Sequence, residues 1–508
     1  MNADAENPRG SQVSQAPPIN SVKYSRSAPD TVDPQTASNR FAVIVLGILV
    51  VICLGVAAIV LPFTLDSYCN CPSVPNLSGS PSPTASPGSS PSSTLPPGTP
   101  TATPTRLDDV SDQFVQFVNN YARRISGDEP FVDPSSPQFR AAQFIADGST
   151  FGSTISSLGQ LDDLYAVTVL YYSTKGDGWT ECSKEGTNCD GEPWLSSDVS
   201  NCEWNWITCN DDGRVVDIVF TNADGNNLDG PLTLEMGLLT GLTQFVAVNN
   251  KISGSFPEEF GKLTNVTRLI LPSNSMNGTI PNDFLADSPL QIVILSDNGF
   301  SGNIPQSFSE VTTLTQVHLA NNSFSGTIPE AFGSLPNLGI LDLTENLLIG
   351  IIPDAIYSDT LERLYLGGNQ QLTGSISSAV GDATSLLRLR IPDTMIEGNI
   401  PEELFTLPRL EEIHLANNNL SGTLSSSVAN LGDTLRILKL DGNELSGSLP
   451  SDAINQLIIS NILTFEQNSF TGSISSETCG RIGNGRDRLQ ELTVDCNEVS
   501  CSCCTNCP

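Results

Sequence analysis

The sequence contains few histidines and few basic residues for its length of 508. Its 2 His leave little room for His-containing catalytic triads or His-ligated metals. The 23 Lys and Arg stand against 56 Asp and Glu, which gives a formal net charge of −33. Nucleic-acid binding requires Lys and Arg to neutralise phosphates, and this balance disfavours it. Because no nucleophile, carboxylate pair or phosphate loop stands out, we expect a protein that is not an enzyme and needs no metal or cofactor.

One long apolar segment indicates the compartment. Residues 41–63 contain no charged residue, and a helix of this length spans about 35 Å, enough to cross a hydrocarbon core of about 30 Å. Four Lys and Arg precede the segment, and none follows until Arg106. The positive-inside rule therefore predicts a transmembrane signal-anchor helix in the cell membrane, single-pass type II. Residues 1–40 are then a disordered cytosolic tail, and the C-terminal ectodomain lies outside.

Residues 64–106 form a low-complexity segment that is rich in Ser, Thr and Pro from residue 72 onward. Outside a cell, this composition is typical of an O-glycosylated or flexible stalk. Such a disordered stalk holds the following domain away from the membrane. Cys69 and Cys71 lie at its start, where they could cross-link two chains or bond within one chain.

A glycine recurs every 24 or 25 residues between Gly230 and Gly472, which is the signature of a solenoid. Within each unit, apolar residues alternate along a short predicted strand, as in residues 314–329 and 338–353. An asparagine follows each strand, and a buried asparagine can bond the backbone groups that the bend leaves unpaired. We expect a ladder of such residues, broken once at Thr394: Asn250, Asn274, Asn298, Asn322, Asn346, Asn369, Asn418, Asn443, Asn468 and Asn497.

The repeating unit resembles the motif LxxLxLxxNxLSGxIPxxLxxL of the plant-type leucine-rich repeat family, and the resemblance covers roughly residues 160 to 508. It implies an α/β repeat fold: a curved leucine-rich-repeat solenoid with disulfide-bonded caps and about 11 repeats in residues 215–476. Members of the family include receptor-like proteins without a kinase domain, ectodomains of receptor kinases and polygalacturonase inhibitors.

The flanks resemble the caps that solenoids need, because end repeats would otherwise expose apolar surface. Residues 107–214 are expected to form a helical and Cys-containing N-terminal cap. The cap resemblance pairs Cys202 with Cys209, and Cys182 with Cys189 is the expected neighbouring disulfide. Residues 477–508 are expected to form a final half-repeat and a Cys-rich C-terminal cap.

The six cysteines of the C-terminal cap allow many disulfide connectivities, so none is assigned. The alternative is thiolate metal binding by the C-x-C-C-x-x-C sequence, which an oxidising compartment disfavours.

Five N-x-S/T sequences are acceptor motifs for N-glycosylation of an extracellular chain. The acceptors are Asn76, Asn265, Asn277, Asn321 and Asn419. Asn321 and Asn419 adjoin the predicted ladder, and we expect them to be partly shielded.

The resemblance places the strands on the concave side of the solenoid, with the leucines pointing inward and the residues between them outward. The central outward residues are apolar in the early repeats and mixed or basic in the later ones. The candidate ligand-binding residues on this concave face are His318, Arg363, Tyr365, Arg388, Arg390, His414 and Lys439.

Arg388 and Arg390 resemble the Arg-x-Arg element with which plant peptide-receptor ectodomains hold the terminal carboxylate of a ligand. Two guanidinium groups two residues apart on one strand point to the same side and can bind an anion together. The alternative is that these arginines only solvate the strand face, or pair with Glu362 or Glu412, as exposed ion pairs commonly do.

The segments together predict a membrane-anchored extracellular recognition protein. It would bind a peptide, glycan or protein ligand on its concave face and signal through a partner such as a co-receptor, because 40 cytosolic residues are too few for a kinase domain. The alternatives are an adhesion or cell-wall-associated scaffold and an inhibitor of a secreted hydrolase. The anchor argues against the inhibitor.

Overall fold

The computed structural model describes residues 107–508 except 149–154, 185–187, 190, 484–487 and 505–508. The predicted cytosolic tail, apolar segment and stalk, together with Cys69, Cys71 and Asn76, lie outside the described residues. Among the helices of the described part, none is both long and apolar enough to cross a membrane.

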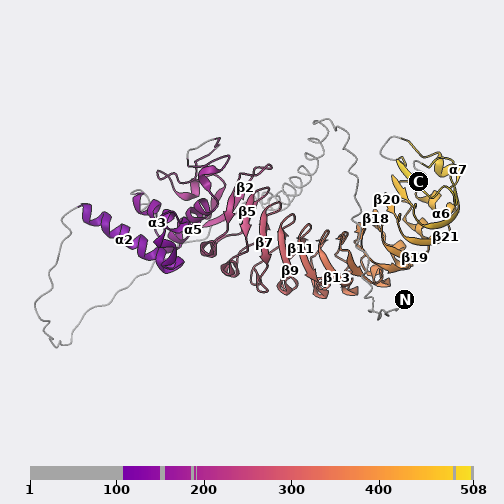
Figure 1. Cartoon of the computed structure of the whole chain (residues 1–508), viewed down its shortest axis with the longest axis horizontal. Helices are drawn as coiled ribbons and strands as arrows, with labels where there is room; N and C mark the ends of the chain where they lie inside the picture. Colours follow the sequence, from indigo (N-terminus) through magenta and orange to yellow (C-terminus); the bar gives the residue numbers. More distant parts are fainter. Residues whose placement is uncertain (1–106, 149–154, 185–187, 190, 484–487, 505–508) are drawn as a thin grey trace, which may run out of the picture. The chain divides into compact units, whose positions relative to one another are not determined.

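A 13-stranded sheet connects all the repeats (Figure 1). Its first pair is antiparallel, and the later neighbours pair in parallel because each strand begins a new turn of the same coil. The strands are β1 (Ile207–Cys209), β2 (Val215–Phe220), β4 (Gln244–Ala247), β6 (Arg268–Ile270), β8 (Ile292–Ile294), β10 (Gln316–His318), β12 (Ile340–Asp342), β14 (Arg363–Tyr365), β16 (Arg388–Arg390), β18 (Glu412–His414), β20 (Ile437–Lys439), β22 (Ile462–Thr464) and β24 (Glu491–Thr493).

Two narrower parallel sheets run along a second side of the turns. The 7-stranded sheet contains β3 (Asp229–Pro231), β5 (Lys251–Gly254), β7 (Ser275–Thr279), β9 (Gly299–Asn303), β11 (Ser323–Gly326), β13 (Leu347–Ile351) and β15 (Gln371–Thr373). The 5-stranded sheet contains β17 (Glu397–Gly398), β19 (Asn419–Thr423), β21 (Glu444–Ser448), β23 (Ser469–Ser473) and β25 (Val499–Ser500).

Short 3₁₀ helices, more than α-helices, complete the turns. A proline immediately precedes several of them, for example Pro257 and Pro329, and only a few residues remain before the next strand. The helices are η5 (Leu234–Leu238), η6 (Glu258–Lys262), η7 (Gln306–Ser309), η8 (Glu330–Ser334), η9 (Asp354–Ile356), η10 (Ser378–Asp382), η11 (Glu402–Thr406), η12 (Ser426–Leu431), α6 (Ser451–Gln456) and α7 (Ser476–Cys479). The expected α/β repeat is therefore mainly a β/3₁₀ repeat.

The buried asparagine ladder is present and links each turn to the one before it. Asn346 is 4% exposed, and its Oδ1 accepts the N–H of Phe324 at 3.0 Å. Its Nδ2 donates to the carbonyls of Leu319, Leu343 and Thr344 at 3.0 to 3.1 Å. One side chain thus satisfies backbone groups of two successive repeats that would otherwise be buried without partners.

The ladder differs from its prediction at both ends. It begins one turn earlier, at the fully buried Asn226, whose Oδ1 accepts the N–H of Glu181 at 2.8 Å. The prediction of Asn497 is wrong: Asn497 is exposed, and the carboxylate of Asp495 accepts the N–H groups of Gln467 and Asn468 instead. The last repeat is longer than the others, and this irregularity displaces the accepting group. Thr394, which replaces the asparagine in its turn, donates its N–H and its hydroxyl to Oδ1 of the ladder residue Asn418.

Three helices cover the open end of the first repeats: α2 (Leu107–Ser126), α3 (Pro137–Asp147) and α5 (Leu158–Ser173). Helix α5 is apolar on most sides because α3 packs on it and η5 of the first repeat lies against it. Beyond α5, Trp179, Trp194 and Phe220 form an aromatic cluster with ring centroids 4.9 and 5.7 Å apart. Disulfides join Cys182 to Cys189 and Cys202 to Cys209, the two pairs expected from the sequence.

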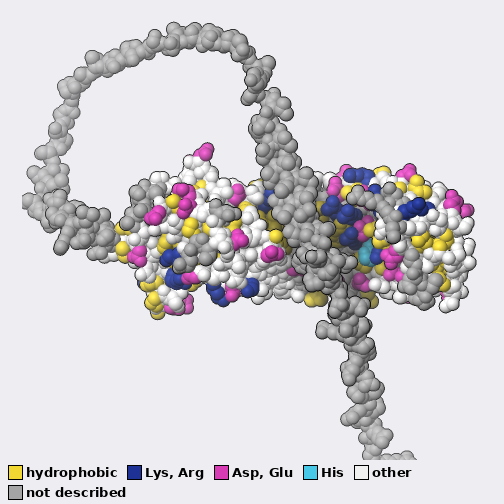
Figure 2. Space-filling view, turned by 90° about the horizontal axis from the view of Figure 1, so that it is seen from above, with side chains coloured by type: hydrophobic (Ala, Val, Ile, Leu, Met, Phe, Trp, Pro, Cys, Tyr) yellow, Lys and Arg dark blue, Asp and Glu magenta, His cyan; other side chains and the backbone are white. Residues whose placement is uncertain are grey.

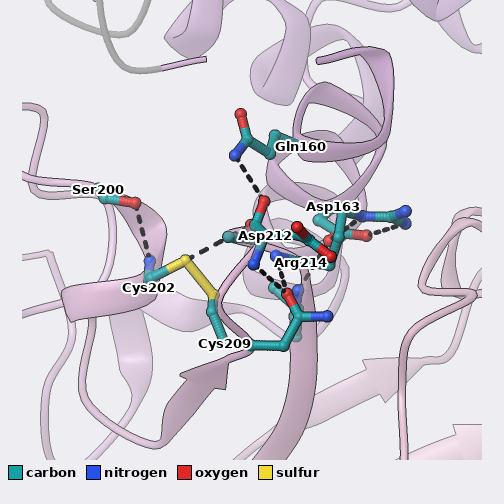
Figure 3. Close-up of a disulfide and its surroundings, with 10 residues drawn as sticks. Gln160, Asp163, Ser200, Cys202, Cys209, Asp212 and Arg214 are labelled. Carbon is teal, nitrogen blue, oxygen red and sulfur yellow. Dashed lines mark hydrogen bonds and ion pairs between the residues drawn. A yellow bond between two sulfur atoms is a disulfide. The ribbon is translucent and has the colours of Figure 1, made fainter. Parts of the chain in front are cut away.

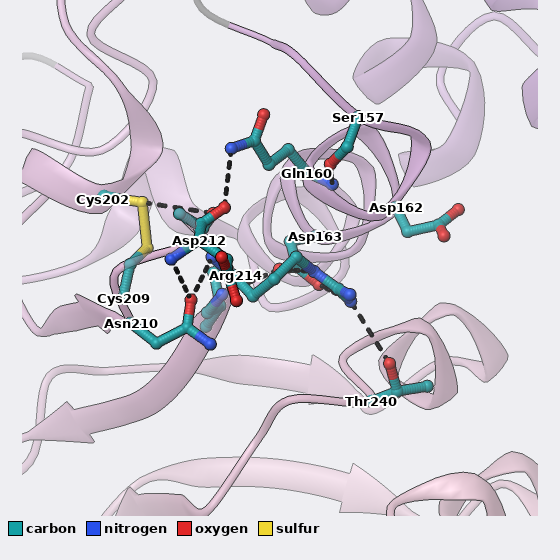
Figure 4. A network of polar contacts seen from close by, with 12 residues as sticks. Ser157, Gln160, Asp162, Asp163, Cys202, Cys209, Asn210, Asp212, Arg214 and Thr240 are labelled. Atoms are coloured by element: carbon teal, nitrogen blue, oxygen red, sulfur yellow. Dashed lines mark hydrogen bonds and ion pairs between the residues drawn. A yellow bond between two sulfur atoms is a disulfide. The ribbon is translucent and has the colours of Figure 1, made fainter. Parts of the chain in front are cut away.

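A buried ion pair fastens α5 to the first strands. The carboxylate of Asp163 is fully buried and receives Arg214 Nε at 2.8 Å, Arg214 Nη2 at 3.0 Å and the Val215 N–H at 2.7 Å. Figures 3 and 4 show Arg214 reaching from the turn beside the Cys202–Cys209 disulfide to α5. Burial raises the pKa of Asp163, and these three hydrogen bonds counter that rise. Asp163 was not singled out in the sequence, because its partner is 51 residues away.

Disulfides also hold the C-terminal cap. Cys479 bonds Cys503 and Cys501 bonds Cys504, and Cys496 is disulfide-bonded as well. The Sγ atoms of Cys479, Cys501 and Cys503 lie within 4.8 Å of one another. Their thiols are engaged in these bonds, so in this form they are not available as the thiolate ligands of the metal-binding alternative.

We predict that Arg214→Ala lowers the free energy of unfolding by about 3–5 kcal/mol, because it leaves a buried carboxylate without its partner. The matched control is Lys175→Ala, which removes the exposed ion pair to Asp229 and should cost about 0–1 kcal/mol. Urea unfolding of the two variants measures the difference. Equal losses would show that the Asp163–Arg214 pair does not fasten the cap.

We also predict that Asn346→Ala lowers the free energy of unfolding by about 2–4 kcal/mol, because it leaves a buried N–H and several buried carbonyls without hydrogen-bond partners. The control is Asn337→Ala, which removes an exposed asparagine with one hydrogen bond and should cost about 0.5 kcal/mol. Thermal unfolding followed by circular dichroism would give both values. A small loss for Asn346→Ala would mean that water replaces the ladder.

Candidate ligand-binding face

The third residues of strands β4 to β24 of the 13-stranded sheet form a continuous row, here called the outward row. Strand pairing places each member directly beside the next, as for His318 with Asp342 and Tyr365 with Arg390. The row is Val246, Ile270, Ile294, His318, Asp342, Tyr365, Arg390, His414, Lys439, Thr464 and Thr493. The order expected from the repeat frame is thus the observed one.

The seven candidate residues are brought onto one face. His318 to Lys439 occupy strands β10 to β20, which span about 24 Å at the usual distance between strands. The residues two positions earlier on two of these strands, Arg363 and Arg388, are also direct neighbours. In Figure 2, Lys and Arg side chains gather beside a His over the later repeats. His318 and His414 are four strands apart, so they cannot share a metal.

Glu412 lies among the Lys and Arg side chains of strands β14 to β20, here called the basic group: Arg363, Arg388, Arg390 and Lys439. Its carboxylate is 8% exposed and accepts Arg390 Nε at 2.7 Å and Arg390 Nη2 at 2.8 Å. Arg388 Nε lies 3.9 Å from the same carboxylate. The guanidinium of Arg390 also stacks 5.0 Å from the ring centre of Tyr365. Arg390 is therefore paired with Glu412, as the alternative interpretation of the sequence expected. Its Nε and Nη2 donors are already bound to this carboxylate.

The electrostatics of the outward row differ from residue to residue. Burial works to lower the pKa of Arg390, but the hydrogen bonds and charge of Glu412 outweigh it and raise this pKa. Burial and the nearby charge of Lys439 lower the pKa of His414, so both favour its neutral form. Burial opposes the ionised form of Asp342, but bonds from His318 and Thr344 hold its pKa below the usual value.

A cavity of about 270 Å³ opens beside the basic group. It is lined by Leu387, Pro408, Arg409, Glu411, Asp433, Thr434, Arg436 and Ile459. Leu387, Glu411 and Arg436 each immediately precede a strand of the 13-stranded sheet. The sequence prediction missed these residues because it followed only the central outward position. Extending the repeat frame three positions toward the N-terminus from Arg390, His414 and Lys439 would have found Leu387, Glu411 and Arg436.

The four described glycosylation motifs lie away from the outward row. Asn277 and Asn419 belong to β7 and β19 of the narrower sheets, Asn321 lies in the turn after β10, and Asn265 precedes β6. All four side chains are exposed. The expectation that Asn321 and Asn419 are shielded is therefore wrong, because each side chain points away from the ladder.

Known families match part of the solenoid. Residues 312–371 match a family described as leucine rich repeat, and residues 289–311 and 409–431 match a second family of the same description. A comparison with curated proteins found no match.

Solved structures with related folds include plant receptors. The plant peptide hormone receptor RGFR1 in complex with RGF2 is 31% identical with a TM-score of 0.50, over 54% of this chain and 43% of that chain. The Arabidopsis receptor kinase HAESA, in complex with the peptide hormone IDA and the co-receptor SERK1, is 28% identical with a TM-score of 0.45, over 54% and 53%. A plant ice-binding protein is 23% identical with a TM-score of 0.49, over 61% and 96%.

Residues 289–371 and 409–431 match leucine-rich-repeat families, as the sequence predicted. The resemblance to the plant peptide hormone receptor RGFR1 is consistent with a plant-type extracellular leucine-rich-repeat protein. The chain covers 43% and 53% of the lengths of these two receptor chains.

We predict that Arg390→Ala lowers the free energy of unfolding by about 1–3 kcal/mol. The change leaves Glu412 buried without its main partner, and the partial exposure of Arg390, 41%, reduces the cost. Adding Glu412→Gln should recover most of the loss, because no buried charge then remains. Thermal unfolding of the single and double variants tests this. A double variant no more stable than Arg390→Ala would show that the pair is not a structural one.

Proposed function

We propose that this chain is a membrane-anchored, receptor-like recognition protein that binds a peptide or protein ligand along the outward row. The observation that carries the proposal is the register of the row, which aligns His318, Tyr365, Arg390 and Lys439 on adjacent or nearby strands. The part of the row from His318 to Lys439 is about 24 Å long and suits an extended peptide, which spans about 3.3 Å per residue. Side chains at regular intervals can then read successive ligand residues.

Two further observations support this assignment. The later part of this face carries Arg363, Arg388, Arg390 and Lys439 in a chain of net charge −33, so an acidic ligand is attracted there and repelled elsewhere. RGFR1, the structure at 31% identity, is a peptide hormone receptor. The anchor at residues 41–63, the type II orientation at the cell membrane and a signalling partner such as a co-receptor are parts of the same proposal that rest on the sequence.

The experiment uses the detergent-solubilised full chain and an array of synthetic acidic, neutral and basic peptides. We expect saturable 1:1 binding of a defined acidic peptide, measured by biolayer interferometry. The double variant Tyr365→Ala, Lys439→Ala should weaken that binding by about 10-fold or more. The control is Ser325→Ala with Thr327→Ala, on and beside β11 of the 7-stranded sheet, which should bind like the unmodified chain.

An adhesion scaffold would behave differently in the same assay. It would bind glycan polymers weakly and without saturation, depend strongly on Ca²⁺, and respond equally to both double variants. That pattern would contradict the recognition proposal.

A further inference from the structure

Strand β13, near the middle of the repeats in Figure 1, carries an exposed apolar patch on the 7-stranded sheet. Leu347, Ile349 and Ile351 are 54%, 42% and 62% exposed, whereas Leu348 is fully buried. Successive side chains of a strand point to opposite faces, so the three exposed ones share one face of the sheet. Three of the eight well-exposed large apolar side chains in the described part of the chain therefore lie together, here called the β13 patch.

The β13 patch departs from the repeat at every outward position of its strand. In the repeat frame, the corresponding residues are Ser323, Ser325 and Thr327 one turn earlier and Gln371, Thr373 and Ser375 one turn later. Among the described strands of the two narrower sheets, only β13 has apolar residues at all three positions. The neighbouring strands form with hydroxyl side chains, so the turns do not need apolar residues here. A contiguous apolar patch that folding does not require is typical of an interaction surface.

The surroundings of the β13 patch are uncharged. The outward residues on and beside strands β9, β11 and β15 are Gly299, Ser301, Asn303, Ser323, Ser325, Thr327, Gln371, Thr373 and Ser375. The whole chain has a net charge of −33, so two copies repel each other over most of their surfaces, and a basic partner is attracted to acidic surface elsewhere. On this face no like charges meet, and no charge has to be desolvated. A second copy of the chain can therefore approach here.

The β13 patch is also self-complementary, because its three aliphatic side chains are arranged evenly about Ile349. A two-fold axis that lies in the plane of contact and passes through Ile349 places the three side chains of one copy on the three of the other. Two sheet faces can pack in this way at about 10 Å from each other. We propose that the β13 patch is the contact between two copies of this chain, which form a symmetric dimer in one membrane.

The small area of the patch explains why the membrane matters. Three strands about 4.8 Å apart, with about 3.4 Å per residue, present an area of about 250 Å² in each copy. Stable dimers of free proteins bury about 800 Å² in each partner. Anchors in one bilayer raise the effective concentration of the two copies, so a weak contact suffices. The inference thus uses the membrane anchor of the proposed function, but it does not depend on ligand binding by the outward row.

The test measures energy transfer between donor-labelled and acceptor-labelled copies of the full chain in phosphatidylcholine vesicles, over a range of protein-to-lipid ratios. The triple variant Leu347→Ser, Ile349→Ser, Ile351→Thr gives β13 the outward residues of the preceding turn, and circular dichroism confirms that it is folded. It should weaken dimerisation by about 10-fold or more, because both copies lose their apolar contact. The matched control is Ile458→Ser, which removes an aliphatic side chain of similar exposure, 56%, outside the sheet and should leave dimerisation unchanged.

Each result of this comparison supports or overturns the dimer contact. Weaker dimerisation of the triple variant, with Ile458→Ser unchanged, supports it. Equal energy transfer in the triple variant and the unmodified chain overturns it, as does absence of transfer in the unmodified chain at every ratio. An equal loss in Ile458→Ser also overturns it, because exposed apolar residues in general would then cause the association.

Photo-crosslinking locates the contact. The photoreactive residue p-benzoylphenylalanine, introduced in place of Thr373 on β15, should crosslink to strands β11 to β15 of the other copy. The same residue in place of Thr471 on β23, far from the patch, should give no crosslinked dimer. Crosslinking from β23 but not from β15 would place the contact elsewhere and overturn the proposal.

The same proteins separate this inference from the proposed function. The triple variant should bind the acidic peptide of the array like the unmodified chain, because β13 belongs to the 7-stranded sheet and the outward row to the 13-stranded sheet. If no peptide binds, recognition fails while the dimer contact stands. If the chain does not float with the vesicles, the anchor fails. Sedimentation of the unmodified chain and the triple variant at high concentration then decides whether the patch mediates self-association.

Discussion

One buried asparagine in each turn determines the geometry of everything else in this solenoid. Its Oδ1 holds a backbone N–H that lies 22 residues earlier, and its Nδ2 holds carbonyls of its own turn and of the preceding one. Because the same bonds recur from Asn274 to Asn468, except at Thr394, successive turns are fixed to one another at one distance and in one register. Without such a partner, the tight bend after each strand would leave buried polar groups unsatisfied.

The outward row is a consequence of this register. Its residues meet because each strand repeats the position of the one before, so that residues about 24 apart in sequence become neighbours in space. The contacts that matter therefore run across strands: His318 to Asp342, Arg390 to Glu412 and Arg390 to Tyr365. A change at one strand alters the partners of the next, which is why Arg390 cannot be interpreted from its own strand alone.

The regular part of the molecule was predictable, and the irregular part was not. The period, the ladder from Asn250 to Asn468 and the order of the outward row followed from spacing. The two N-terminal disulfides followed from the cap resemblance. The ends escaped prediction because they break the period: Asn226 begins the ladder, Asp495 ends it, and Asp163 finds Arg214 through a contact that no repeat encodes. The ion pair between Arg390 and Glu412 was not predicted uniquely, because it depends on side-chain length and conformation, which a strand pattern does not specify.

The surplus of acidic residues makes the basic side chains of the later strands electrostatically distinct from the rest of the surface. In a neutral protein, a few arginines would attract many anions weakly; here the rest of the surface repels them. At physiological ionic strength, salt limits this repulsion to about 8 Å from each acidic residue. Distant acidic residues therefore do not cancel the positive potential close to the basic side chains. Glu412 accepts two hydrogen bonds from Arg390 and lies 3.9 Å from Arg388 Nε. This buried carboxylate therefore offsets part of the positive charge that the later strands bring together.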